Sequence, residues 1–145
     1  MSAKGEQAAN NLLKEHMNCA QSVLTVFCEE LGLERATALR LTMGFGGGEG
    51  HTGGTCGAVV GAYLVFGLQQ ELQTNMQPAK DKAVARIMEF PRRFKEKHAS
   101  TLCPQLLGYD VRIEEQFKAA LKDGAFATKC TALVRDAAEI VEEMN

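Results

Sequence analysis

Residues 44–68 read GFGGGEGHTGGTCGAVVGAYLVFGL, a glycine-rich segment followed directly by the most apolar stretch of the chain. Seven of the eleven residues from 44 to 54 are glycine, so this segment is expected to form a loop rather than a helix or strand. The apolar sequence of residues 56–73 predicts a buried helix. Its apolar run of about 14 residues is shorter than the roughly 20 that a membrane span requires.

The remaining sequence has the periodicity of helices joined by short breaks, with no convincing alternation typical of strands. Further helices are predicted at residues 5–15, 19–31, 34–43, 79–98, 113–122 and 129–144, and a turn at 103–108. Pro91 is expected to kink the 79–98 helix, whose end is basic. The predicted fold is an all-α, single-domain bundle of about six or seven helices over residues 1–145, with the glycine-rich loop before its central helix.

Composition narrows the classes of function. The formal net charge is −2 and there is no tryptophan, so nothing favours binding to nucleic acid or to an anionic membrane. The first residues contain no apolar signal core, which makes the cytoplasm the expected compartment. Structural disulfides are not expected there, and five cysteines is an odd number.

Four of the five cysteines follow a residue type that caps helix N-termini. The pairs are Asn18 and Cys19, Thr55 and Cys56, Thr101 and Cys103, and Thr128 and Cys130. A thiol in the first turn of a helix lies near the positive end of the helix dipole, which favours the thiolate. Thiolates bind metals and attack disulfides, so the pattern indicates redox or metal chemistry.

Cys28 differs from the other four cysteines. It lies nine positions after Cys19, which is half a turn away on a helix, and it is in mid-helix. We therefore interpret Cys28 as a core residue.

The glycine-rich loop leads directly into the helix that Cys56 begins. We expect Gly53 and Gly54 to let the chain turn tightly, so that backbone N–H groups point at the Cys56 sulfur. Gly57 and Gly61, four residues apart, indicate close packing of another helix. His51 and Glu49 in the loop have no assigned role.

The spacing of the candidate cysteines argues against paired-ligand zinc modules and a thioredoxin-type site, because no two are separated by only two residues. If Cys19, Cys56, Cys103 and Cys130 converge, each comes from a different helix. The basic end of the 79–98 helix is then placed to offset their negative charge.

Several of these elements together resemble a known family. They are Asn18-Cys19-Ala20-Gln21-Ser22-Val23, the Cys56-Gly57-Ala58-Val59-Val60-Gly61 element, Cys103 with Leu106-Leu107-Gly108 and Asp110, and a C-terminal Cys130. The chain resembles the C_GCAxxG_C_C family of small redox-active proteins from about residue 8 to 142. The resemblance implies that Cys19, Cys56, Cys103 and Cys130 are the four cysteines shared with the family and that Cys28 is not one of them. It also implies that the protein has a redox function.

The leading expectation is a redox protein whose four cysteines bind an iron–sulfur cluster for electron transfer, with Gly53 and Gly54 beside it. One alternative is a cofactor-free thiol–disulfide protein. Another is a metal-binding or metal-handling module that binds a thiophilic metal. We expect a redox partner protein, which the sequence does not identify, and the sequence is compatible with a homodimer.

Overall fold

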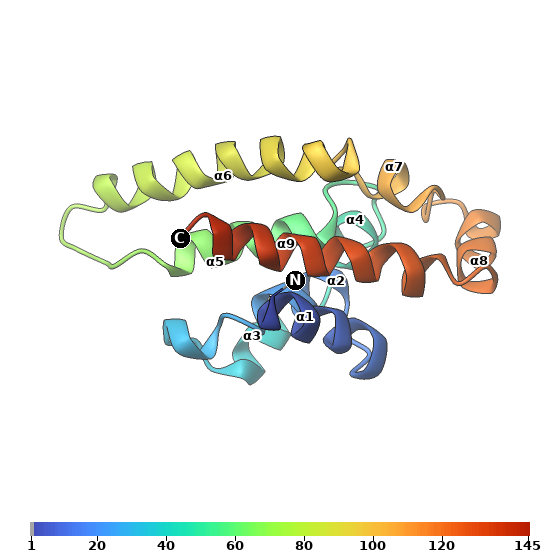
Figure 1. Cartoon of the computed structure of the whole chain (residues 1–145), viewed down its shortest axis with the longest axis horizontal. Coiled ribbons are helices and arrows are strands. Elements are labelled where there is room, and N and C mark those ends of the chain that lie inside the picture. The colour runs from blue at the N-terminus through green and yellow to red at the C-terminus, as the bar shows by residue number, and fades with distance from the viewer. Residues whose placement is uncertain (1) are drawn as a thin grey trace.

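The computed structural model describes residues 2–145 and is all-α, as the sequence predicted. Helices α5 and α9 run through the middle, with α6 on one side and α1 to α3 on the other (Figure 1). The α-helices are α1 (Ala3–Lys14), α2 (Cys19–Leu24), α3 (Arg35–Leu41), α4 (Gly46–Glu49), α5 (Gly57–Leu68), α6 (Gln77–His98), α7 (Cys103–Leu107), α8 (Glu114–Lys122) and α9 (Thr131–Glu143). None of the described helices is both long and apolar enough to span a membrane.

The helix predicted over residues 19–31 is divided in the structure. The α-helical part ends at Leu24, and a 3₁₀ turn, η1 (Glu29–Leu31), follows. Near the break, the Thr25 hydroxyl donates to the Gln21 carbonyl at 2.7 Å and accepts from the Asn11 side chain at 3.1 Å. Such side-chain bonds to a helix backbone compete with regular geometry, which accounts for the early end of α2.

Four buried phenylalanines hold the central layers together. Phe27 comes from the turn after α2, Phe66 from α5, and Phe90 and Phe94 from α6. The ring of Phe90 lies 5.8 Å from that of Phe66 and 5.6 Å from that of Phe94, within the range of favourable aromatic pairs. Helix α6 continues without interruption through Pro91.

The buried residues form two clusters of unequal size. The larger lies among α1, α2, α5, α6 and α9 and includes Cys56. The smaller lies between α7, α8 and the π-helical segment η2 (Phe126–Cys130), and includes Cys103 and Cys130. Cys19 packs against both clusters. The four candidate cysteines therefore lie where the two cores meet.

Candidate functional site: four thiols at the junction of two cores

Asn18 fixes the position of Cys19 at the start of α2. Its side chain accepts from the Gln21 N–H at 2.8 Å, and the Gln21 side chain accepts from the Asn18 N–H at 3.0 Å, which is a capping box. The Asn18 amide also donates to the Thr42 carbonyl at 2.9 Å. The capping role predicted for Asn18 is confirmed, and the same side chain ties α2 to the segment that leads into the glycine-rich loop.

A short backbone pairing sets Cys56 and Cys103 side by side. The Cys56 N–H donates to the Thr101 carbonyl at 2.8 Å, and the Cys103 N–H donates to the Gly54 carbonyl at 2.9 Å. Thr55 and Leu102 form an isolated antiparallel bridge between the same two segments. The predicted capping by Thr55 and Thr101 is wrong. The segments that contain these two threonines pair with each other through their backbones, and the N-caps of α5 and α7 are Cys56 and Leu102.

Close packing of α2 on α5 brings Cys19 against the Cys56 helix. A Cβ atom at Gly57 would lie 2.9 Å from the Ala20 nitrogen and 3.0 Å from the Cys19 Cβ. A Cβ atom at Gly61 would lie 3.0 Å from both the Ala20 oxygen and the Val23 Cβ. The interpretation of Gly57 and Gly61 as a helix-packing surface agrees with these contacts.

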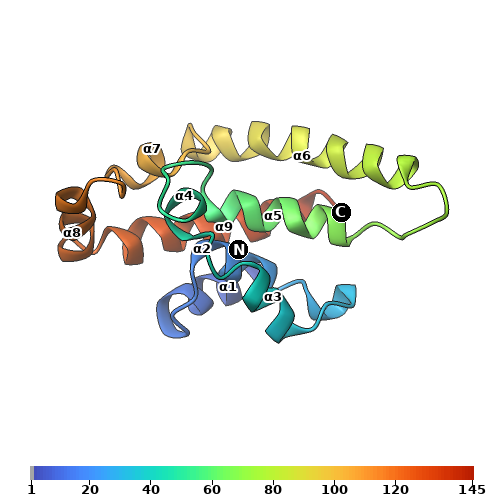
Figure 2. The ribbon, with the colours of Figure 1, turned by 180° about the vertical axis from the view of Figure 1, so that it is seen from behind.

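The glycine-rich loop contains a left-handed turn, which includes α4 and lies against α5 and α7 (Figure 2). All five residues from 47 to 51 have positive φ, between 62° and 77°. The Gly50 N–H and the His51 N–H both donate to the Gly46 carbonyl, at 2.9 and 3.0 Å. Only glycine adopts this conformation without steric cost, so the glycine density serves the turn itself.

Gly48 is buried where this turn meets the thiols. A Cβ atom there would lie 2.7 Å from the Gly54 nitrogen and 2.8 Å from the Cys103 Cβ. Gly48 and Gly47 line the cavity between the cysteines, whereas Gly53 and Gly54 do not. Gly53 has φ +75°, but Gly54 has no positive φ, and its carbonyl serves the Cys103 N–H. The sequence alone does not show which glycines line the cavity, since Gly47, Gly48, Gly53 and Gly54 all belong to the same glycine-rich segment.

Cys130 lies at the end of η2, a π-helical segment that precedes α9. The expected cap by Thr128 is wrong, because its hydroxyl donates back to the Gly124 carbonyl at 3.0 Å. The neighbouring Lys129 ammonium donates to the Leu107 carbonyl at 3.0 Å, which ties η2 to the end of α7. Single π-helical turns are rare and are frequent at functional sites.

The structure brings the four candidate thiols together. Cys19, Cys56, Cys103 and Cys130 line one cavity of about 30 Å³, and its other walls are Gly47, Gly48, Gly57, Leu106, Leu107, Phe126 and Leu133. Cys28 is not among them. It is fully buried in the larger core, where its thiol contacts the Thr25 carbonyl at 3.6 Å.

The thiols differ in their affinity for a proton. Hydrogen bonding from Cys19 lowers the pKa of Cys56 from its ordinary value, and the N–H groups of Ala58 and Val59 act in the same direction against the effect of burial. Hydrogen bonds with Cys130 and Cys56, together with burial, raise the pKa of Cys19 well above that value. Of these two thiols, Cys56 therefore releases its proton more readily, and Cys19 keeps its proton.

Burial determines the state of Cys103. It raises the pKa of this thiol to about 12, and the neighbouring Cys56 and Cys130 add to the effect. Cys103 is therefore a neutral thiol at physiological pH.

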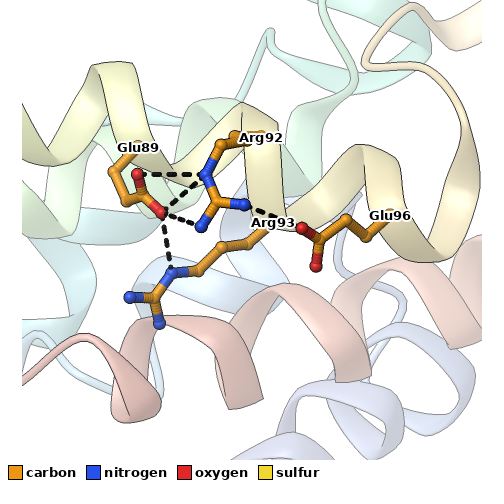
Figure 3. Close-up of polar contacts among 4 residues, drawn as sticks. All are labelled: Glu89, Arg92, Arg93 and Glu96. Carbon is orange, nitrogen blue, oxygen red and sulfur yellow. Dashed lines mark hydrogen bonds and ion pairs between the residues drawn. The ribbon is translucent and has the colours of Figure 1, made fainter.

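Two of the basic residues at the end of α6, which is predicted to offset the charge of these thiols, pair instead with carboxylates of their own helix. Arg92 is paired with Glu89 and with Glu96, the latter at 2.8 Å, and Arg93 is paired with Glu89 at 3.2 Å (Figure 3). Their charges are balanced within one helix face, and α6 contributes no residue to the cavity walls.

The four thiols have the donor composition that an iron–sulfur cluster requires. Within residues 2–145, however, no group of three or more His, Cys, Asp or Glu side chains is arranged to hold a metal ion. The cavity of about 30 Å³ has room for water rather than for a cluster. The side chains would have to move apart before a cluster could bind.

Comparison with protein families gives one match, over residues 17–144, to the family described as "Putative redox-active protein (C_GCAxxG_C_C)". The chain belongs to this family. No curated protein and no solved structure matches it. Both the four-cysteine arrangement and the family assignment thus indicate redox activity, without naming a cofactor.

Proposed function

We propose that the protein is a thiol–disulfide redox protein in which Cys19 and Cys56 form the reactive dithiol. The observation that carries the proposal is that both thiols line one small cavity, at the N-termini of α2 and α5. There the neighbouring Cys19 thiol and the N–H groups of Ala58 and Val59 lower the pKa of Cys56. A thiolate beside a protonated partner thiol is the arrangement that thiol–disulfide exchange uses.

The reaction transfers two electrons. One thiolate attacks a sulfur of an external disulfide, forms a mixed disulfide and releases one external thiolate, which takes the proton of the partner thiol. The partner thiolate formed in this way then attacks the protein sulfur of the mixed disulfide, which forms the Cys19–Cys56 bond and releases the second external thiolate. The dithiol is oxidised, the external disulfide is reduced, and the reverse sequence regenerates the dithiol with a reducing partner.

The test is the identity of the disulfide that forms first. The reduced protein would be equilibrated with glutathione redox buffers, quenched with acid, digested without reductant and examined by mass spectrometry. A Cys19–Cys56 linkage is expected in the wild type and in Cys28→Ser, and none in Cys56→Ser. A first disulfide that joins any other pair would contradict the assignment.

A four-thiolate iron–sulfur site is the second candidate, since all four thiols line one cavity. In that case Cys19, Cys56, Cys103 and Cys130 would hold the cluster, which supplies one-electron chemistry. Anaerobic reconstitution with iron and sulfide, followed by metal and sulfide analysis that includes zinc and copper, separates this candidate from the first. Visible absorbance that persists in Cys28→Ser and is lost in Cys103→Ser would favour the cluster, and colourless metal binding would favour metal handling.

A further inference from the structure

A second and larger cavity, the outer pocket, lies beside the four-thiol cavity. Its volume is about 480 Å³, within the range of small-molecule sites. The two cavities share Cys19, Cys130, Gly47 and Phe126, so one wall separates them. The outer pocket therefore lies next to the redox centre, with Cys19 and Cys130 in the wall between them.

The walls of the outer pocket are mainly apolar. Leu12, Leu13, Met17, Leu121, Phe126 and Ala127 line it, and His16 and His51 are its titratable side chains apart from the thiols. Leu13 and Leu121 are 47% and 57% exposed, although they border a cavity. Apolar side chains left accessible around a cavity are typical of a ligand-binding site.

Access to the thiols is unequal. Cys19 is partly exposed, whereas Cys56 and Cys130 are 3% and 6% exposed. Cys56 and Cys103 do not line the outer pocket. A molecule in the pocket thus meets Cys19 before it can meet the Cys56 sulfur behind it.

We infer that the outer pocket admits a low-molecular-weight disulfide with apolar substituents, which exchanges first with Cys19 before Cys56 resolves the mixed disulfide. The inference rests on the proposed thiol–disulfide function. The buried thiols argue for a small substrate, because the disulfide has to enter a pocket rather than dock on a surface. The apolar walls argue for apolar substituents on its sulfurs.

The contact between the two protein thiols provides the route of the proton. As Cys19 attacks the substrate, its proton passes to the Cys56 thiolate in the same cavity, and one substrate thiolate leaves. That thiolate takes the proton from Cys56 and departs as a thiol. The Cys56 thiolate then attacks the Cys19 sulfur, forms the protein disulfide and releases the second substrate thiolate, so the single proton and the single negative charge are conserved.

The first test closes the pocket. Ala127 is exposed and lines the pocket, so Ala127→Trp is expected to obstruct the pocket without entering a core. Ala85→Trp is the matched control, because Ala85 lines a different surface groove that contains no cysteine. With dithiodipyridine as the probe, Ala127→Trp is expected to slow oxidation about tenfold, which corresponds to roughly 1.4 kcal/mol in the barrier. Ala85→Trp is expected to react as the wild type does.

The second test identifies the entry thiol. In Cys56→Ser the mixed disulfide with the probe cannot be resolved by Cys56, so its mass is expected on Cys19. Trapping on Cys130, or an unchanged rate in a folded Ala127→Trp, would overturn the inference. Either result would leave the proposed function intact, provided that the Cys19–Cys56 linkage still forms at long times. A protein disulfide that oxidises the wild type faster than dithiodipyridine would also overturn it.

Discussion

At the scale of single residues, Cys56 combines two sources of thiolate stabilisation that come from different parts of the chain. The N–H groups of Ala58 and Val59 belong to its own helix, whereas the Cys19 thiol comes from α2. The first source is visible in the sequence as a cysteine at a helix start. The second depends on how α2 packs on α5, which the sequence indicates only through Gly57 and Gly61.

Removing the Cys19 thiol is expected to raise the pKa of Cys56, because its hydrogen bond is the largest of the effects that lower this pKa. The ultraviolet absorbance of the thiolate, measured as a function of pH, should therefore show the Cys56 transition at a higher pH in Cys19→Ala than in the wild type. Cys28→Ala serves as the control and should not change the Cys56 transition. An unchanged Cys56 transition in Cys19→Ala would show that the backbone donors act alone.

Cys28 provides a test of the division between core and site cysteines. Its side chain is fully buried in the larger core and contacts the Thr25 carbonyl, away from the four-thiol cavity. Cys28→Ala is expected to lower the free energy of unfolding by about 1 kcal/mol, through loss of packing. Urea denaturation measures this cost, and the Cys19–Cys56 disulfide should form at the wild-type rate. A change in the rate or identity of the disulfide would mean that Cys28 belongs to the redox site.

At the scale of elements, the contact of α5 with α2 decides whether Cys19 reaches Cys56. Gly61→Ala places a Cβ atom 3.0 Å from the Ala20 oxygen and the Val23 Cβ, so α2 has to shift outward. We expect a lower melting temperature and slower formation of the Cys19–Cys56 disulfide. Thermal unfolding and mass spectrometry of the oxidised protein measure the two effects.

Gly67 supplies a matched control on the same helix, because a Cβ atom there meets nothing within 4 Å. Gly67→Ala should stabilise the protein by roughly 0.5–1 kcal/mol through the unfolded state and leave the disulfide unchanged. If both alanine variants behave alike, the close approach of α2 and α5 has no part in the redox contact.

The sequence predicts the long helices but not the local geometry around the thiols. Hydrophobic periodicity located the long helices, including α6 and α9, because one face of each has to be buried. Thr55, Thr101 and Thr128 have the chemistry of caps, but tertiary pairing and a π-helical turn imposed other geometry on their segments. The left-handed turn at 47–51 packs so closely against Gly54 and Cys103 that Gly48 has no room for a Cβ atom, and no local pattern encodes this packing.

At the scale of the whole molecule, the site joins two hydrophobic clusters, so the state of its thiols affects global stability. Cys103 shows the sign of this effect. Its pKa rises from 9.0 to about 12 on folding, so between these values the unfolded chain releases the proton that the folded protein keeps. Stability from this thiol is complete below pH 9 and is lost as the pH rises toward 12.

Cys103→Ser removes this titration while nearly preserving the side-chain volume. We expect the stability of the wild type to fall more steeply than that of the variant as the pH rises above 9. Urea unfolding under reducing conditions, at neutral pH and midway through the alkaline range, measures the two slopes. Parallel slopes would mean that the Cys103 thiol has an ordinary pKa in the folded protein.

The left-handed turn has a consequence for stereochemistry. Glu49 and His51 hold φ values of 65° and 62°, which cost an L-residue on the order of 1–2 kcal/mol each. For a D-amino acid the same angles are the relaxed ones. A chemically ligated chain with D-glutamate at position 49 would relieve that cost without altering the hand of the turn. Ribosomal synthesis offers no D-residues, and the achiral glycines at 47, 48 and 50 are its nearest substitute for a short mirror-image helix beside the thiols.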